Sequence, residues 1–322
     1  MELTKQEADR PLVILTGPTA VGKTALSIAL AKAINGEIIS ADSMQVYRHM
    51  DIGSAKIKTE EMAGVPHHLI DVLEPTEAFN VVVFQKLAKE AMKEIYERGC
   101  IPILVGGTGF YIQAVLYDID FTENDEDASL RSELEGLARR EGPEILYEKL
   151  KAVDPDACKS IHAHNVKRVI RALEFYEKTG QRISEHNEIQ RQNISPYRFA
   201  YFVLNDRREE IYKRIDIRVD QMMAAGLVEE VRQLKGMGCT KDMVSMQGLG
   251  YKEILRYLEG ELTLEEAVYL IKRDTRHFAK RQLTWFRREK DVIWMEKGNF
   301  DQCGQNVLDQ MQEILRDKTI IL

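Results

Sequence analysis

The sequence has few cysteines and no long apolar run. Its four cysteines are widely spaced, and no C-x-x-C pair suggests a zinc or redox site. The apolar stretches fall short of the roughly 18 residues that a membrane-spanning helix needs, and the polar N-terminus carries no signal-peptide pattern. These absences argue against secreted, disulfide-rich and membrane proteins. We therefore expect a cytoplasmic protein with reduced thiols and no membrane association.

The chain also lacks an overall excess of basic residues, since its net charge is −7 over 322 residues. This value argues against a nucleic-acid partner, but a polyanion responds to local charge and not to the average over the surface. Residues 272–290 contain eight lysines and arginines against two acidic residues, a local net charge of +6. A basic segment in an acidic chain keeps nucleic acid among the expected partners.

One stretch carries a specific phosphate-binding pattern. Residues 17–24 read GPTAVGKT, follow the apolar run 12–15 and lead into a helix-forming segment at 25–34. This is the G-x-x-x-x-G-K-[ST] pattern in the strand, loop and helix order that it requires. Backbone N–H groups at such a helix N-terminus attract an anion, and the threonine hydroxyl can bind a phosphate-bound Mg²⁺. The predicted phosphate-binding residues are Gly17, Pro18, Thr19, Ala20, Val21, Gly22, Lys23 and Thr24, with Thr24 as the metal ligand.

Two further strand ends carry residues suited to chemistry. Asp42 ends the β-type run 37–42, and Thr108 lies in the glycine-rich segment 106–111 after the buried strand expected at 101–105. Ligands of an open parallel sheet bind outside the carboxyl ends of the strands, so both side chains should face the same crevice as the phosphate loop. From spacing alone, Asp42 is equally suited to be a general base, a metal ligand or a turn cap. Thr108 can donate its hydroxyl to a phosphate oxygen.

The adjacent histidines His67 and His68 suggest a metal site. They lie in a loop-rich stretch at 50–80 that glycines and prolines interrupt. Neighbouring side chains point in different directions on any regular element, so the two rings do not converge readily on one ion. We expect a structural role for both.

The order of the elements predicts an α/β fold with a P-loop NTPase-like parallel sheet flanked by helices, and with an inserted all-helical domain. Strand and helix patterns alternate in the first part of the chain, and strands resume at 198–204 and 292–295. Between these parts, residues 123–195 begin with an acidic run and are otherwise helix-like. The predicted domains are an α/β core formed by 1–122 and 196–322, and a helical insertion at 123–195.

One helix of the insertion carries both a buried stripe and a basic face. The apolar residues at helical spacing are Val166, Val169, Ile170, Leu173 and Tyr176. Lys167, Arg168 and Arg171 flank this stripe. The residues alone favour a solvated face with i,i+4 pairs such as Glu174 to Lys178. Three basic residues without an acidic neighbour are also compatible with a phosphate contact.

The segment 207–218 predicts a helix with Arg207, Arg214 and Arg218 on one face. An arginine stripe after a core strand can close over a bound pyrophosphate, because guanidinium groups bind phosphate oxygens in pairs. The same stripe is equally consistent with a salt-bridged surface, since acidic residues alternate with the arginines. Both interpretations stay open.

The last long helix begins at Thr263, where Thr263 and Glu266 form a capping-box pattern. Its expected buried stripe consists of Ala267, Ile271, Phe278 and Trp285. A second face carries basic residues at helical spacing, namely Arg273, Arg276, Lys280 and Arg287. A cationic stripe of this density, with Gln282 within it, suits a nucleic-acid backbone.

Seven motifs, in register over nearly the full length, resemble one family, the bacterial tRNA dimethylallyltransferases of the IPP transferase family. The motifs are GPTAVGKT at 17–24, ADSMQVYR at 41–48, GGTGFYIQAVL at 106–116, NVKRVIRALEFYEKTG at 165–180, the arginine-rich helix at 207–218, MQGLGYKEI at 246–254 and TRHFAKRQLTWFRRE at 275–289. The resemblance implies transfer of a dimethylallyl group from dimethylallyl diphosphate to N6 of the adenine 3′-adjacent to the anticodon in tRNA, with release of diphosphate and a need for Mg²⁺. The cysteines of the zinc finger that eukaryotic members carry are missing, so the bacterial type fits.

The resemblance also implies roles for individual residues. The loop 17–24 holds the prenyl diphosphate instead of ATP, with Arg214 and Arg218 nearby. Asp42 becomes the general base that takes a proton from the adenine amine, and Thr108 the second catalytic residue. The residues implied to bind tRNA are Asp42, Ser43, Met44, Gln45, Thr108, Arg131, Val166, Lys167, Arg168, Val169, Ile170, Arg171, Gln247, Lys252, Lys280, Arg281, Gln282 and Trp285. The expected partners are the tRNA anticodon stem-loop and dimethylallyl diphosphate, and the expected assembly is a monomer.

Three other functions account for part of the sequence. A small-molecule P-loop kinase explains Lys23 and Thr24, but it leaves the basic last helix and the insertion without a purpose. Prenylation of a free adenine nucleotide needs the same chemistry, yet the basic helix favours a macromolecular acceptor. A non-catalytic RNA-binding protein would use the phosphate loop structurally and would not need Asp42.

Overall fold

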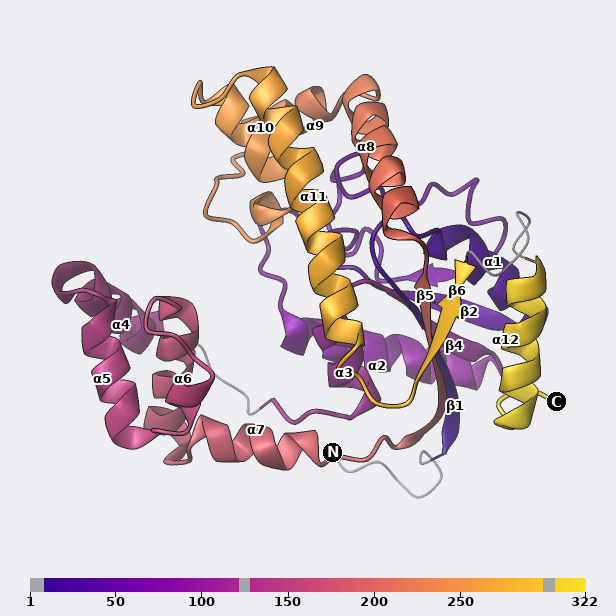
Figure 1. Cartoon of the computed structure of the whole chain (residues 1–322), viewed down its shortest axis with the longest axis horizontal. Coiled ribbons are helices and arrows are strands. Elements are labelled where there is room, and N and C mark those ends of the chain that lie inside the picture. Colours follow the sequence, from indigo (N-terminus) through magenta and orange to yellow (C-terminus); the bar gives the residue numbers. More distant parts are fainter. Residues whose placement is uncertain (1–8, 122–127, 298–304) are drawn as a thin grey trace. The chain divides into compact units, whose positions relative to one another are not determined.

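The computed structural model describes three ranges of the chain, residues 9–121, 128–297 and 305–322. Strands and helices alternate along most of the first range, and helices dominate the second (Figure 1). Within these ranges, no helix combines the length and the apolar character that crossing a membrane requires.

The chain divides into two compact units. The first combines Met1–Leu116 with Pro196–Leu322, and the second is Tyr117–Ser195. The second unit thus begins shortly before residue 123, where the insertion is predicted to start. The acidic run predicted at 123–127 lies outside the described residues.

A six-stranded sheet forms the centre of the first unit (Figure 1). Its strands are β1 Arg10–Thr16, β2 Gly36–Ala41, β3 His67–His68, β4 Ile101–Gly106, β5 Tyr197–Asn205 and β6 Val292–Glu296. Their order across the sheet is β3-β2-β4-β1-β5-β6, and every neighbouring pair runs parallel. The parallel α/β core predicted from the alternating pattern is confirmed.

Both faces of the sheet are covered, which explains why its central strands read as continuous apolar runs. The helices of the first unit are α1 Lys23–Ile34, α2 Val81–Glu97, α3 Gly109–Leu116, α8 Arg208–Ala224, α9 Leu227–Gly236, α10 Tyr251–Leu258, α11 Leu264–Phe286 and α12 Gln305–Asp317, with a 3₁₀ turn η2 at Ser245–Gln247. Successive side chains of a strand point to opposite faces. Val13 of β1 packs with Leu30 of α1 and Met311 of α12 in one core, while the next residue, Ile14, is equally inaccessible to solvent.

Helix α11 begins as the sequence predicts but buries a different stripe. The Thr263 hydroxyl accepts the N–H of Glu266, and the Glu266 carboxylate accepts the N–H of Thr263. The buried residues are Ala267, Ile271, Ala279, Gln282 and Phe286, whereas Phe278 and Trp285 are only half-buried. From Ile271 onward the predicted stripe advances in steps of seven residues, and an α-helix of 3.6 residues per turn drifts by about 20° over each such step. The buried positions are therefore Ala279 and Phe286, each one residue after the predicted Phe278 and Trp285.

The second unit is a separate helical body with its own core. Its helices are α4 Ala128–Glu141, α5 Pro143–Val153, α6 Val166–Thr179 and α7 Ile183–Arg191, with a 3₁₀ turn η1 at Ala157–Lys159. Leu146 and Leu150 of α5 pack against Val169 and Leu173 of α6. Asp154 is buried at the end of α5, where it accepts hydrogen bonds from the N–H of Ala157 and from the N–H and hydroxyl of Ser184. The predicted all-helical insertion is therefore present.

Candidate active site

The phosphate loop, residues 17–24, connects the carboxyl end of β1 to the first turn of α1. Gly17 has φ +143°, and a Cβ on it would lie 2.2 Å from the carbonyl oxygen of Leu204. Gly22 has φ +101° and is the N-cap of α1, where no side chain caps the helix and no acidic residue occupies the first turn. Both positions therefore require glycine. The first N–H groups of α1 are left to bind an anion.

Lys23 lies within this loop and is half-buried. Its Nζ donates to the carbonyl oxygens of Gly17 and Pro18, each at 2.9 Å. Burial, assisted by the charge of Arg218, lowers the pKa of Lys23 to about 8, and the carboxylate of Asp42 opposes both effects. The structure thus brings Lys23, Arg218 and Asp42 close enough to influence one another, although they come from three different elements.

Asp42 follows β2 directly, at the edge of the sheet where β1 ends in the phosphate loop. Its Oδ1 accepts the N–H of Met44 at 2.9 Å, so the turn-capping role that the sequence left open is present. Burial raises the pKa of Asp42, and this effect outweighs the opposing influence of the Met44 N–H, Lys23 and Arg218. A carboxylate with a raised pKa is a better proton acceptor than an ordinary aspartate, which suits a general base.

Two glycines of the segment after β4 lie close against side chains of α11. A Cβ on Gly107 would lie 2.1 Å from Nε2 of Gln282, and a Cβ on Gly109 would lie 2.2 Å from the indole ring of Trp285. These two glycines therefore allow α11 to approach the segment closely. Thr108 is half-buried between them, and its carbonyl oxygen accepts the N–H groups that start α3.

Gln282 connects the two loops. Its Oε1 accepts the N–H of Thr19 at 2.9 Å, and its Nε2 donates to the carbonyl oxygen of Gly107 at 3.0 Å. The residue is only 6% exposed. The sequence singled out Gln282 as a tRNA contact; the structure gives its amide two backbone partners, so its evident role is to hold the phosphate loop against the loop that carries Thr108.

The two arginines of α8 differ in their partners. Arg214 donates from Nε to the carbonyl oxygen of Ala20 at 2.9 Å and from Nη2 to Asp206 at 2.7 Å. Its guanidinium therefore holds the phosphate loop from outside. Arg218 has no ion pair within hydrogen-bond distance among the described residues, and burial lowers its pKa while Asp42 raises it. Of the two, Arg218 has the cation available to a ligand.

Two predicted tRNA-binding segments of the first unit lie against each other. A Cβ on Gly248, next to Gln247, would lie 2.7 Å from the sulfur of Met44. The sequence did not single out Glu230, a buried residue whose carboxylate accepts the N–H groups of three consecutive residues, Asp51, Ile52 and Gly53. This carboxylate anchors the chain just after the 42–45 segment. No local pattern indicates that role, because the partners lie almost 180 residues apart.

The charge of the basic segment 272–290 is partly neutralised by acidic residues of α8. Lys272 pairs with Asp220 at 2.6 Å, and Arg276 pairs with Asp216 at 2.8 Å. Lys280 and Arg281 are exposed and have no carboxylate partner among the described residues. The positive charge of the segment 272–290 is therefore reduced near its start and persists toward its end.

The predicted tRNA-binding residues of α6 divide into two groups. Lys167, Arg168 and Arg171 are exposed, while Val169 and Ile170 are buried in the helical core and support the helix from inside. Glu174 accepts two hydrogen bonds from Arg131 of α4, at 2.8 and 3.0 Å. Arg131 thus joins α4 to α6.

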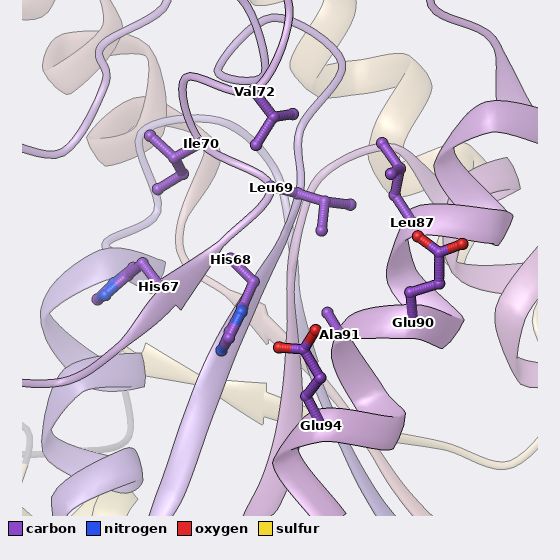
Figure 2. Close-up of a pocket in the computed structure, with 9 residues that line it drawn as sticks. All are labelled: His67, His68, Leu69, Ile70, Val72, Leu87, Glu90, Ala91 and Glu94. Carbon is purple, nitrogen blue, oxygen red and sulfur yellow. The ribbon is translucent and has the colours of Figure 1, made fainter.

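A pocket of about 290 Å³ lies beside β3 and α2 (Figure 2). Its lining residues are His67, His68, Leu69, Ile70, Val72, Leu87, Glu90, Ala91 and Glu94. Nε2 of His68 lies 2.7 Å from Glu37, and Nδ1 of His67 lies 2.8 Å from the carbonyl oxygen of Val65, so both rings have protein partners. Across the three described ranges, no three His, Cys, Asp or Glu side chains are grouped to hold a metal ion. None of the pocket residues belongs to the predicted site.

Comparison with known proteins identifies the family. The family model described as IPP transferase matches residues 45–289. The tRNA dimethylallyltransferase of Lachnoclostridium phytofermentans is 64% identical over 312 residues, which cover 97% of this chain and 99% of that protein. The protein of the same name from Carboxydothermus hydrogenoformans is 54% identical, with 89% of this chain and 92% of that protein covered.

Solved structures agree with this assignment. The tRNA isopentenylpyrophosphate transferase of Bacillus halodurans is 45% identical, with a TM-score of 0.73 over 97% of this chain and 98% of that chain. A eukaryotic dimethylallyltransferase captured acting on tRNA is 30% identical, with a TM-score of 0.82 over 95% of this chain and 78% of that chain. The phosphate loop and Asp42 precede the residues that the family model matches, but the relatives align with nearly the whole chain. The chain belongs to the IPP transferase family.

Proposed function

We propose that this protein transfers a dimethylallyl group from dimethylallyl diphosphate to N6 of the adenine 3′-adjacent to the anticodon in tRNA, releasing diphosphate. The observation that carries the proposal is the grouping of Asp42 with Lys23 and Arg218 beside the phosphate loop. This grouping offers one proton acceptor and two cations at one edge of the sheet. Those are the groups that an amine nucleophile and a diphosphate leaving group require.

In the proposed reaction, the N6 amine attacks C1 of the dimethylallyl group. The new N–C bond forms as the bond between C1 and the diphosphate oxygen breaks, and the electron pair of that bond leaves with the diphosphate. The surplus proton of the amine passes to the carboxylate of Asp42. Asp42 is oriented for this step because the N–H of Met44 holds its Oδ1 at 2.9 Å. The target base must leave the anticodon-loop stack to reach this carboxylate.

The diphosphate is held by the phosphate loop in this proposal. The N–H groups at the start of α1, Lys23 and Arg218 stabilise the negative charge that develops on it, while Thr108 offers a hydroxyl from the loop after β4. We assign the diphosphate contact to Arg218 instead of Arg214, because Asp206 and the Ala20 carbonyl occupy the Arg214 guanidinium.

A magnesium ion fits this site. Thr24 lies in the first turn of α1 with its side chain exposed, and Mg²⁺ typically takes one or two protein ligands together with substrate phosphates and water. When bound, the ion neutralises part of the diphosphate charge. Thr24 would hold it through its hydroxyl.

The tRNA contacts are proposed for exposed basic residues of each unit. In the first unit these are Lys280 and Arg281 of α11, and in the second Lys167, Arg168 and Arg171 of α6. Phosphate contacts of this kind fix the register of an RNA, whereas unstacked loop bases supply its sequence identity. The proposed assembly is a monomer, since one chain supplies every group that the reaction needs. The proposed location is the cytoplasm.

The test is incubation with labelled dimethylallyl diphosphate, Mg²⁺ and unmodified tRNA, followed by nucleoside analysis. We expect label on one adenosine and release of diphosphate. A tRNA with guanosine at that position should receive no label. Phosphate transfer from ATP to a small molecule would indicate a kinase, prenylation of free AMP without tRNA would indicate a nucleotide prenyltransferase, and tRNA binding without transfer would indicate a non-catalytic protein. Each of these results contradicts the proposal.

A further inference from the structure

A second lysine lies beside the phosphate loop. Lys297 directly follows β6, whose last residue, Glu296, is in register with Asn205 at the end of β5. Since β5 and β1 run parallel as neighbours, β6 ends at the same edge of the sheet as β1. The chain therefore delivers Lys297 to the edge that carries the loop, from the side opposite β2 and Asp42.

The ammonium group of Lys297 reaches the loop backbone. A Cβ on Gly22 would lie 3.1 Å from Nζ of Lys297, closer than an ordinary van der Waals contact. Gly22 is the N-cap of α1. The cation is thus placed where the first N–H groups of the helix converge and where a phosphate would bind.

Lys297 has no partner within the described residues. Its neighbour Glu296 is engaged by Asn205, whose Nδ2 lies 3.0 and 3.1 Å from the two carboxylate oxygens. Of the other cations at the loop, Arg214 binds Asp206 and Lys23 donates to two carbonyl oxygens of the loop, whereas Arg218, like Lys297, has no carboxylate within ion-pair distance among the described residues. A cation beside the positive end of a helix dipole is unfavourable unless an anion lies between them.

We infer that Lys297 is a further ligand of the diphosphate, contacting its oxygens from the β6 side of the loop while Lys23 contacts them from within the loop. This inference rests on the proposed function for the identity of the anion. Two lysines on opposite sides would hold the two phosphate groups separately and would share the negative charge that develops on the leaving diphosphate. An RNA phosphate is the other anion that this position could take, and the experiment separates the two.

The experiment compares Lys297→Gln with Lys290→Gln, an exposed lysine just before β6 that also has no carboxylate partner among the described residues. Inorganic pyrophosphate with Mg²⁺ is titrated calorimetrically into each full-length protein, and the KM values for dimethylallyl diphosphate and for tRNA are measured. For Lys297→Gln we expect pyrophosphate affinity to fall roughly 5- to 30-fold and the donor KM to rise by a similar factor, with the tRNA KM unchanged. Lys290→Gln should match the wild type in pyrophosphate affinity and in the donor KM.

A charge-retaining variant guards against a merely structural effect. Lys297→Arg should keep pyrophosphate affinity within about threefold of the wild type, and Lys297→Glu should lose more than Lys297→Gln. Wild-type pyrophosphate affinity in Lys297→Gln would overturn the inference, and so would a defect confined to tRNA binding. Pyrophosphate binding needs no transfer to tRNA, so a wild-type protein that binds it without prenylating tRNA would refute the proposed function and leave the role of Lys297 measurable.

Discussion

The side chain of Gln282 accepts the N–H of Thr19 across 263 residues of sequence, at 2.9 Å. The same amide donates to the carbonyl oxygen of Gly107 at 3.0 Å. One buried side chain thereby links the loop proposed to hold the diphosphate to the loop that carries Thr108. The separation of these two loops depends on α11, a helix that contributes neither of them.

Removing this link should impair use of the donor. Gln282→Leu keeps the approximate volume but leaves the Thr19 N–H and the Gly107 carbonyl without their partner, and each buried unpaired group costs about 1–3 kcal/mol. We expect kcat/KM for dimethylallyl diphosphate to fall on the order of 10- to 100-fold in steady-state assays. Gln282→Glu, which retains an acceptor for Thr19 but no donor for Gly107, is the comparison for the separate contacts. A folded Leu variant with wild-type donor kinetics would show that the link is dispensable.

Replacing the proposed base should stop the chemistry and spare binding. Asp42→Asn keeps an oxygen that can accept the Met44 N–H but cannot take up a proton from the adenine amine. We expect kcat to fall by about 10²- to 10⁴-fold, the usual contribution of a general base, while tRNA affinity measured by filter binding stays within a few-fold. Asp317→Asn, at an exposed aspartate that ends α12, serves as the control. Turnover near the wild-type rate in Asp42→Asn would remove Asp42 from this role.

The pH dependence of donor use should report on Lys23. Its pKa lies at about 8, below the ordinary 10.5 of a lysine, because burial and Arg218 disfavour the charged form. The free enzyme therefore loses this positive charge as the pH rises through about 8, and kcat/KM for the donor should decline above that value. Arginine stays charged throughout this range, so Lys23→Arg should be less active overall but should lack this decline. Profiles measured over roughly pH 6 to 10 decide the point; an identical basic limb in both proteins would assign the titration to another group.

Within the basic segment 272–290, Lys280 and Arg281 should contribute more to tRNA affinity than Lys272 and Arg273. Lys280 and Arg281 are exposed without carboxylate partners among the described residues, whereas Lys272 and Arg273 pair with Asp220 and Asp274.

Replacing Lys280 and Arg281 together by glutamine should weaken tRNA binding and reduce the slope of log K against log salt by about 1 to 2, because fewer counterions are released. The matched double variant of Lys272 and Arg273 should change the slope little, since acidic partners already neutralise those charges. Equal slopes for the two double variants would place the RNA elsewhere.

The ion pair between Glu37 and Arg98 should make the free energy of unfolding depend on pH. Glu37 of β2 is buried, and Arg98 donates two hydrogen bonds to it at 2.8 Å. These bonds, assisted by His68, hold the pKa of Glu37 at about 2 against the opposing effect of burial. Because this pKa is below that of the unfolded chain, the stabilisation is present above about pH 4.3 and is lost as the pH falls toward 2.

Glu37→Gln should therefore lower the free energy of unfolding by about 1–2 kcal/mol at neutral pH, and the difference from the wild type should shrink below about pH 4. Urea unfolding at several pH values measures it. The control is Glu135→Gln, because 46% of the Glu135 side chain is exposed and its carboxylate lies 3.7 Å from Arg139. A deficit that stays constant down to acidic pH would mean that the carboxylate charge is not its source.

Much of the fold follows from local patterns. The apolar runs before residues 17 and 106 predict buried parallel strands, because only strands covered on both faces lack polar residues over that length. The capping box at Thr263 predicts the start of α11, because its hydrogen bonds join residues three apart. The phosphate loop is predictable for the same reason: glycine, lysine and threonine act through the backbone of the loop that contains them.

The partners of the site residues could not be predicted from local patterns. Local sequence places Gln282 and Arg214 on helices and Lys297 after a strand. It carries no information about which distant residues these side chains contact. Only the tertiary structure decides that Gln282 binds Thr19, that Asp206 occupies Arg214, and that Lys297 reaches Gly22.

The physical reason is the range of the interactions involved. Helices, strands, caps and the phosphate loop depend on contacts within a few residues, so the amino-acid sequence by itself determined them. The charge on α11, the buried stripe of that helix and the cations free to bind phosphate depend on side chains brought together from distant segments. For those features, packing of α8 and α11 against the sheet edge was decisive, because it determines which charges find protein partners and which are left for a ligand.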